Sequence, residues 1–238
     1  MGGSVDLEPE YTLPLYSRTE AARIVDVPER TLRNWALGYV YKTMKGKVEA
    51  LPLITTAAPH GTTPQSVPFV GLAEAYVLAA FRAAGVPMQR IRPAIAWLDE
   101  NIGLPAALAS EQLLTDGAEI LYDFGQRASD QDPEAAKILE DLVVVRNQQR
   151  VFAPIVRNYL RTVTYRNGWV ELIHLPQYER VDVIVDPRIN FGKPTVATRG
   201  IRVADIVSRL QAGEKPSQVA WDYGLRTEDV EALRQRAA

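Results

Sequence analysis

Two short runs near the N-terminus carry hydrophobic residues at helical spacing. Residues 19–25 bring apolar side chains together, and residues 29–37 place Leu32, Trp35 and Ala36 on one stripe. Both runs are therefore predicted to be helices. The predicted boundary residues are Ser17 and Glu20, which form a capping-box spacing before the first run, and Gly38, which ends the second.

The residues between these helices predict a tight turn. Asp26 is of a type that tolerates the left-handed backbone conformation, and Pro28 suits a helix start but not a helix interior. Two short helices joined by a tight turn are typical of a helix-turn-helix. Residues 40–56 are rich in β-forming residues with Gly46 in a basic turn, which predicts a small hairpin, or wing.

The middle of the chain shows helical spacing rather than alternation. Residues 1–16 and 57–68, which flank the first module, predict an extended arm and a proline-containing loop. Pro93 would kink its helix or shift the start. The predicted helices cover residues 69–84, 87–101 and 134–151, the last opened by Asp132 and Pro133 and extendable past a kink at Pro154 to residue 161.

After residue 162 the hydrophobic period changes. Residues 163–175 alternate around Asn167 and Gly168, a pair that favours the type I′ turn of a β-hairpin. The remaining predictions are a strand over 181–185, a loop over 186–200, and helices over 203–212, 216–223 and 227–236. The fold class is α+β, mainly helical, with predicted domains 1–101 (winged helix-turn-helix), 102–161 (helical connecting region) and 162–238 (β-hairpin and tri-helical domain).

Composition removes several classes of chemistry. The 238 residues include no cysteine, and the two histidines, His60 and His174, lie far apart, so thiol catalysis, disulfides and thiolate metal sites are excluded. No catalytic triad, phosphate-binding loop or dinucleotide fingerprint is present, and we expect no enzymatic activity, catalytic residue, metal or cofactor. No secretory signal or membrane-length apolar run is readable, which predicts a soluble cytoplasmic protein without a membrane partner.

The net charge of −2 conceals a strong pattern. Residues 17–48 hold seven basic and three acidic residues, whereas residues 99–141 hold eleven acidic and two basic residues. Residues 142–199 are again basic, so the acidic and basic segments either meet different partners or pair with each other. Internal pairing is the favoured interpretation for a group of arginines, Arg146, Arg150, Arg157 and Arg161, which could otherwise meet the carboxylates of a nuclease.

The second N-terminal helix offers a face suited to DNA. Arg30, Arg33 and Asn34 share that face, and their guanidinium and amide groups can bond bidentately to guanine and adenine in the major groove. The alternative is an ordinary solvated helix beside a flexible basic loop. The predicted phosphate contacts, which hold the register, are Thr31, Arg18 and the wing residues Lys42, Lys45 and Lys47.

Residues 16–35, YSRTEAARIVDVPERTLRNW, resemble the winged helix-turn-helix of the MerR superfamily. An Arg-Thr-Leu-Arg string is usual in that family's recognition helix, so the resemblance implies that Arg30, Thr31 and Arg33 contact DNA, with Arg18 at the start of the first helix. Asp26 replaces the common turn glycine, and Pro28 the common serine cap. The family's effector-binding cysteines are absent, which excludes metal sensing of that type.

The C-terminus carries a second resemblance. Residues 186–203, DPRINFGKPTVATRGIRV, and 213–230 look like a small uncharacterised helical domain that is often found in antitoxins beside PIN-type ribonuclease toxins. The order Thr198-Arg199-Gly200 departs from the Gly-Thr-Arg of that domain. Together with the MerR-like head, the tail is similar to large VapB-type antitoxins, and this resemblance implies a PIN-type toxin as partner.

These observations predict a DNA-binding antitoxin that represses its own operon as a homodimer and masks a PIN-type ribonuclease. The alternative is a stand-alone MerR-like regulator whose C-terminal domain dimerises or senses a ligand. The last helix begins with Thr227, Glu228 and Asp229, which suit the helix dipole but would repel phosphate, so we assign DNA to the N-terminal module. Trp169 and Trp221 are expected in the core, and His174 is expected to have a structural partner.

Overall fold

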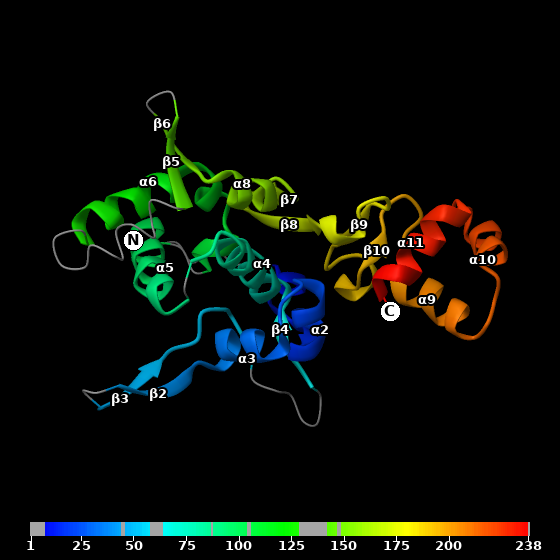
Figure 1. Cartoon of the computed structure of the whole chain (residues 1–238), viewed down its shortest axis with the longest axis horizontal. Coiled ribbons are helices and arrows are strands. Elements are labelled where there is room, and N and C mark those ends of the chain that lie inside the picture. The colour runs from blue at the N-terminus through cyan, green and yellow to red at the C-terminus, as the bar shows by residue number, and fades with distance from the viewer. Residues whose placement is uncertain are drawn as a thin grey trace. The chain divides into compact units, whose positions relative to one another are not determined.

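A computed structural model of the chain describes residues 8–43, 46–57, 64–86, 88–103, 106–128, 142–146 and 149–237. The chain divides into two compact units, residues 1–161 with 165–170 and residues 162–164 with 171–238. Both contain helices and strands, and the described residues are mainly helical (Figure 1). The predicted α+β class is therefore confirmed.

The predicted helix-turn-helix is present in the first unit. Its helices are α2 (Arg18–Ile24) and α3 (Glu29–Leu37), joined by a turn in which Asp26 has a φ of 57°. The Ser17 hydroxyl accepts the Glu20 N–H at 3.2 Å and caps α2 as predicted. The hydrophobic stripe of α3 is buried, so the local sequence pattern and the packing of these helices agree.

Strands on both sides of this module differ from the expectation. The segment predicted as an arm forms α1 (Pro9–Thr12) and β1 (Pro14–Ser17), and the predicted loop ends in β4 (Gln65–Pro68), which pairs antiparallel with β1. The partners are far apart in sequence, and no local pattern encodes such a pairing. The wing is confirmed as the hairpin of β2 (Tyr39–Thr43) and β3 (Gly46–Ala50), which extends beyond α3 in Figure 1.

Helices complete the core of the first unit. Two of them were predicted, α4 (Phe69–Ala83) and α5 (Met88–Ile102), and α6 (Glu111–Ala128) was missed. The predicted helix over 134–151 is wrong where it is described, because β5 (Val143–Arg146) pairs with β6 (Gln149–Phe152). The run of valines at 143–145 favours a strand, and the part of the prediction over 134–141 lies outside the described residues. The remaining elements are η1 (Ala107–Ala109) and α8 (Pro154–Leu160).

The C-terminal segments form a sheet with strand order β11-β10-β9-β8-β7. The strands are β7 (Val163–Arg166), β8 (Trp169–His174), β9 (Val183–Val185), β10 (Thr195–Val196) and β11 (Ile201–Arg202), with short helices η2 (Pro176–Tyr178) and η3 (Asn190–Gly192) between them. The predicted loop over 186–200 thus contains η3 and β10. The positive φ values of Asn167 and Gly168, 53° and 83°, confirm the predicted hairpin turn.

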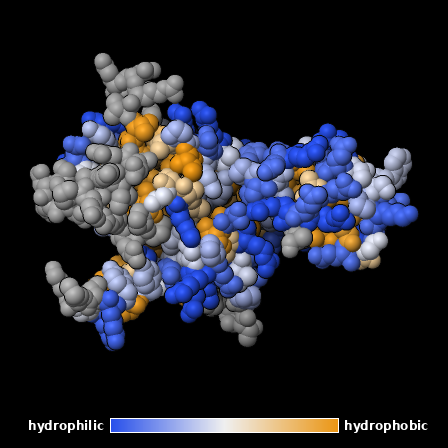
Figure 2. All heavy atoms as spheres, in the orientation of Figure 1, coloured by the Kyte–Doolittle hydropathy of each residue, from blue (hydrophilic) through white to orange (hydrophobic). Residues whose placement is uncertain are grey.

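The three predicted C-terminal helices are confirmed. They are α9 (Val203–Gln211), α10 (Pro216–Tyr223) and α11 (Thr227–Ala237). Val219, Val230 and Leu233 are buried and hold the three helices together. Figure 2 shows mainly hydrophilic colours over this region, with small hydrophobic patches between them.

Candidate nucleic-acid interface

The two sides of α3 differ in chemistry and in exposure. Leu32, Trp35 and Ala36 are 0%, 2% and 1% exposed and anchor the helix in the core. Arg30 and Arg33 lie on the exposed side. The core anchors hold the orientation of the helix, so the guanidinium side is presented to solvent without a cost in buried charge.

The two exposed arginines of α3 are available to bind a ligand. Neither Arg30 nor Arg33 forms an ion pair with any other described residue. Elsewhere in the chain, Arg188 and Arg209 are each held by two carboxylates. Asn34, the third residue of the predicted base-reading set, is half-buried at the rim of the same face.

Contacts from other elements hold the start of α3. Pro28 offers no side-chain cap, but the Thr19 hydroxyl on α2 donates to the Glu29 carboxylate at 2.8 Å and ties the two helices together. On the other flank, Arg82 donates from Nη1 to the Thr31 hydroxyl at 2.7 Å. The predicted phosphate contact Thr31 is therefore also a structural contact between α3 and α4.

Arg82 is a cation of this surface that sequence reasoning missed. It is exposed near the end of α4, and its bond to Thr31 places its charge beside the first turn of α3. No spacing rule links residues so far apart, so only the tertiary fold could find it. Arg18, a predicted phosphate contact, is half-buried and donates to the Ser66 hydroxyl at 3.3 Å. Its guanidinium group therefore has a structural contact within the protein, as Thr31 does.

The wing adds exposed lysines. Lys42 and Lys47 lie directly opposite each other on β2 and β3, and both are exposed. Like charges in opposed positions repel, so a polyanion such as the DNA backbone would stabilise this pair. Lys45, the third predicted wing contact, lies outside the described residues.

Gly38 sets the direction of the wing relative to α3. It has a φ of 68°, and a Cβ at this position would lie 2.2 Å from the carbonyl oxygen of Ala50. The backbone of the wing therefore passes too close to α3 for any side chain. The amide of Leu53, in the segment that follows β3, donates to the Trp35 carbonyl at 2.7 Å and holds the same junction.

The structure also settles several other sequence predictions. Trp169 is buried at 8% exposure, whereas Trp221 is 83% exposed, so the prediction that Trp221 is a core anchor is wrong. Trp221 lies on a short helix whose buried positions are Val219 and Ala220. His174 has the expected structural partner, since its Nδ1 lies 2.7 Å from the Asp182 carboxylate.

Among the residues that the structure describes, the predicted internal pairing of basic and acidic segments is seen at Arg150. Arg150 forms an ion pair with Glu119 and stacks over the ring of Tyr122. Because Arg146 and Arg150 lie on strands, the predicted single helical face of arginines is wrong. Among the described residues, no cluster of three His, Asp or Glu side chains is placed to hold a metal ion. The described helices also include none with the length and apolar character to cross a bilayer.

A helix-turn-helix with an exposed basic helix face and a lysine-bearing wing defines a protein of the DNA-binding class. A family model described as "Putative DNA-binding HTH domain" matches residues 14–95, and one described as "Protein of unknown function (DUF433)" matches residues 183–235. The second match covers β9, β10 and β11 and most of the three C-terminal helices, and it leaves out the hairpin of β7 and β8.

The chain belongs to the VapB-type antitoxin family. It is 44% identical over 233 residues to "Putative antitoxin VapB45" of Mycobacterium tuberculosis strain H37Rv, a match that covers 97% of this chain and 96% of the relative. It is also similar to the crystal structure of Rv2018 from Mycobacterium tuberculosis, with 41% identity and a TM-score of 0.80, over 94% of this chain and 98% of that chain. The predicted resemblance to VapB-type antitoxins is confirmed.

Proposed function

We propose that this protein is a non-enzymatic antitoxin that binds operator DNA through α3 and the wing. The proposal rests on the two sides of α3. Trp35 is fully buried on one side, and Arg30 and Arg33 are exposed on the other, where they have no ion-pair partner among the described residues. The buried tryptophan fixes the orientation of α3, so both guanidinium groups are presented on one exposed face where the phosphates and bases of DNA can reach them.

The basic residues have different roles in this proposal. Arg30 and Arg33, with Asn34 at the rim, read base edges in the major groove, because a guanidinium bonds guanine bidentately. The phosphate contacts, which supply affinity and register, come from Arg18, Thr31 with Arg82 behind it, Lys42, Lys45 and Lys47. This division corresponds to a winged helix-turn-helix of the MerR type within domain 1–101.

The antitoxin half of the proposal is supported by the whole-length similarity to a relative named an antitoxin. The partner is a PIN-type ribonuclease whose acidic metal site the antitoxin occludes or neutralises. The protein acts as a homodimer in the cytoplasm and represses its own operon. Residues 102–161 belong to the same compact unit as the DNA-binding domain and lead from it to the domain of residues 162–238.

Operator binding is tested by a double substitution on α3. Arg30→Ala with Arg33→Ala should abolish a specific gel shift of the DNA upstream of the protein's own operon, while circular dichroism and the melting temperature stay unchanged. The matched control is Arg234→Ala with Arg236→Ala, which removes two exposed arginines from α11 and should leave the shift intact. An unchanged gel shift with the α3 variant rejects the assignment.

Toxin neutralisation is tested by co-purification from the native operon. We expect a nuclease to co-purify in stoichiometric amount, and its cleavage of RNA to be lost on binding. Native mass spectrometry of the complex, with and without operator DNA, gives the stoichiometry. A chain that binds operator DNA but no nuclease would be a stand-alone MerR-like regulator instead.

A further inference from the structure

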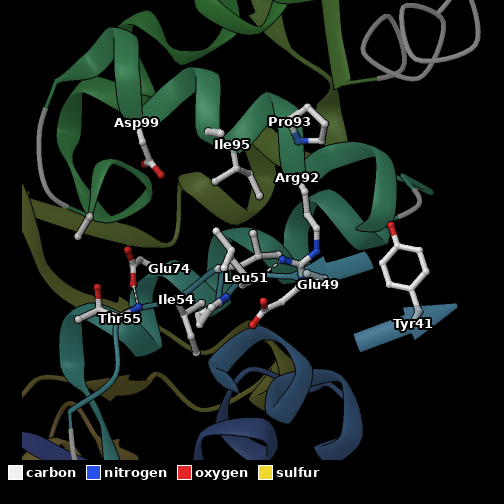
Figure 3. A pocket seen from close by; sticks show the side chains of 15 residues that line it. Tyr41, Glu49, Leu51, Ile54, Thr55, Glu74, Arg92, Pro93, Ile95 and Asp99 are labelled. Carbon is white, nitrogen blue, oxygen red and sulfur yellow. Dashed lines mark hydrogen bonds between the residues drawn. The ribbon is translucent and has the colours of Figure 1, made fainter. Parts of the chain in front are cut away.

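A pocket of about 670 Å3 lies within the first unit, beside the wing (Figure 3). One wall is the chain segment that leaves β3, which includes Leu51 and Ile54, and the opposite wall comes from α4 and α5. The volume is within the range of about 300–1,000 Å3 that is typical of small-molecule sites. The pocket is thus large enough for an organic ligand and is built from elements that touch the DNA-binding module.

The pocket is lined by more acidic than basic side chains. Glu49, Glu74 and Asp99 line it, and Arg92 is the cation among its lining residues. Arg92 is already engaged, because its Nη1 donates to the Leu51 carbonyl and its guanidinium lies 5.3 Å from the centre of the Tyr39 ring. The carboxylates therefore face the space with no free cation from the described wall.

Glu74 is the most constrained of these groups. Its residue is 5% exposed, it accepts the N–H of Thr55, and it forms no ion pair with any described residue. Figure 3 shows its carboxyl group and that of Asp99 turned toward the same space from α4 and α5. Burial, with a smaller contribution from the charge of Asp99, raises the pKa of Glu74 to about 7. Burial also raises the pKa of Asp99.

A buried carboxylate without a cation is costly, and a ligand that supplies the cation would remove that cost. Apolar side chains, among them Ile54, Pro93 and Ile95, also line the pocket. We propose that this pocket binds an organic cation, an amine or amidine on an apolar body, whose charged group pairs with Glu74 and Asp99. The apolar body would lie against the isoleucine side chains.

The position of the pocket couples it to the DNA-binding surface. The backbone N–H of Leu53, in the outer wall, donates a hydrogen bond to the carbonyl of Trp35 on α3. Ala50 packs against Gly38 at the end of the same helix. A ligand that pulls this wall toward α5 would change the position or the rigidity of the wing. This coupling, which rests on the proposed function, must be reciprocal, so DNA and ligand change each other's affinity by the same factor.

The ligand class is tested with three indole probes that share a shape and differ in charge. Tryptamine is cationic, tryptophol is neutral and indole-3-propionate is anionic. Isothermal titration calorimetry of the full chain without DNA should show tryptamine binding, with the neutral and anionic probes at least about tenfold weaker. Equal affinity for tryptamine and tryptophol, or no tryptamine binding, overturns the proposal.

Two substitutions locate the binding site. Glu74→Gln keeps an acceptor for the Thr55 amide, and Asp99→Asn changes the second acid, so each should weaken tryptamine binding by about tenfold without unfolding the chain. The matched control is Glu100→Gln, an exposed acid on α5 that does not line the pocket, which should leave the affinity unchanged. Wild-type affinity in both Glu74→Gln and Asp99→Asn overturns the proposal.

Proton release on binding distinguishes a Glu74 that pairs with the ligand from a Glu74 with a purely structural role. Pairing with a cation lowers the pKa of Glu74, so binding near pH 7 should release about half a proton, and the measured heat should vary with the ionisation enthalpy of the buffer. Glu49, Arg92 and Asp99 are the other charged groups of the pocket, and the release should vanish in Glu74→Gln. Persistence of the release in that variant contradicts the assignment.

The coupling is tested separately by fluorescence anisotropy with operator DNA. Saturating tryptamine should change the operator Kd by about fivefold or more in the wild type and leave it unchanged in Glu74→Gln. Tryptamine binding with no operator binding would disprove the DNA proposal and leave the pocket. Operator binding with no tryptamine binding would disprove the pocket proposal and leave the DNA proposal. Binding of both with an unchanged operator Kd would reject the coupling.

Discussion

The two ends of the chain carry the same local backbone motif with opposite surface charge. In the first unit, α2 and α3 are joined by a turn with Asp26 at a φ of 57°, and in the second unit, α10 and α11 are joined by one with Gly224 at 64°. Beyond the turn, α3 exposes arginines, whereas α11 opens with Thr227, Glu228 and Asp229. The acids complement the positive end of the helix dipole, but they would repel the phosphates of DNA.

The arginines of the two motifs also differ in their partners. Arg226, at the start of α11, forms a bidentate bond to Asp229, and Arg209 on α9 is held by Glu214 and Asp222. Arg30 on α3 has no such partner among the described residues. A helix-turn-helix backbone therefore does not define a DNA site by itself, because neighbouring side chains decide whether its cations are available.

The largest contrast should come from the tryptophans. Trp35→Ala removes a side chain that is 2% exposed and should lower the free energy of unfolding by about 3–5 kcal/mol. Trp221→Ala, at 83% exposure on α10, should change it by about 0.5 kcal/mol or less. Urea unfolding of both variants measures the difference. Similar losses would show that the two helices are anchored in the same way.

The two units should respond to pH in opposite directions. The folded pKa of Glu74, about 7, lies above its ordinary value of 4.5, so the folded first unit holds a proton that the unfolded chain releases. Its stability should therefore fall as pH rises between these values, by an amount on the order of 3 kcal/mol. Urea unfolding across this range should show the slope in the wild type and not in Glu74→Gln.

In the second unit, hydrogen bonds from Arg209 lower the pKa values of Glu214 and Asp222. This contribution to stability is present above the unfolded pKa values and is lost as pH falls through the folded ones. Asp222→Asn should therefore flatten the acid side of the stability curve. A stronger acid dependence in that variant would contradict the role of this ion pair.

Two glycines at positive φ, one in each unit, test how much close packing adds to backbone strain. Gly38→Ala forces a side chain into the Ala50 carbonyl at a positive φ, so we expect a loss of more than about 2 kcal/mol and weaker operator binding. Gly213→Ala, after α9, has a φ of 92° with nothing within 4 Å of the added carbon, and should cost about 1 kcal/mol through strain alone. Thermal unfolding that ranks the two variants in the opposite order would reject this account of the wing junction.

The smallest expected effect concerns salt. With about five phosphate contacts, operator affinity should fall with salt at a log–log slope of about −4 to −5. Lys42→Ala on the wing should reduce the slope by about 0.9, whereas Lys215→Ala, before α10, should leave it unchanged. Titrations at several salt concentrations measure both. An equal change in both variants would place the second unit on the DNA as well.

Sequence reasoning succeeded where the signal is local. The bounds of α3, the cap at Ser17 and the turns at Asp26 and Asn167 depend on hydrogen bonds and backbone preferences within a few residues. The exposure of Arg30 and Arg33 also follows from their spacing relative to Trp35. The strand pairs β1–β4 and β5–β6 differ from the sequence prediction. The partners of the first are distant in sequence, and in the second the β preference of three consecutive valines outweighs the helical spacing.

The amino-acid order alone thus established the helix-turn-helix, the position of its basic face and the tri-helical C-terminus, since each is a property of neighbouring residues. The tertiary fold decided which charged side chains are exposed and which are paired within the protein. Thr31 meets Arg82, Trp221 remains in solvent, and Glu74 lies buried beside a pocket, all through contacts between distant segments. Burial and ion pairing depend on what surrounds a side chain in three dimensions, and no local spacing carries that information.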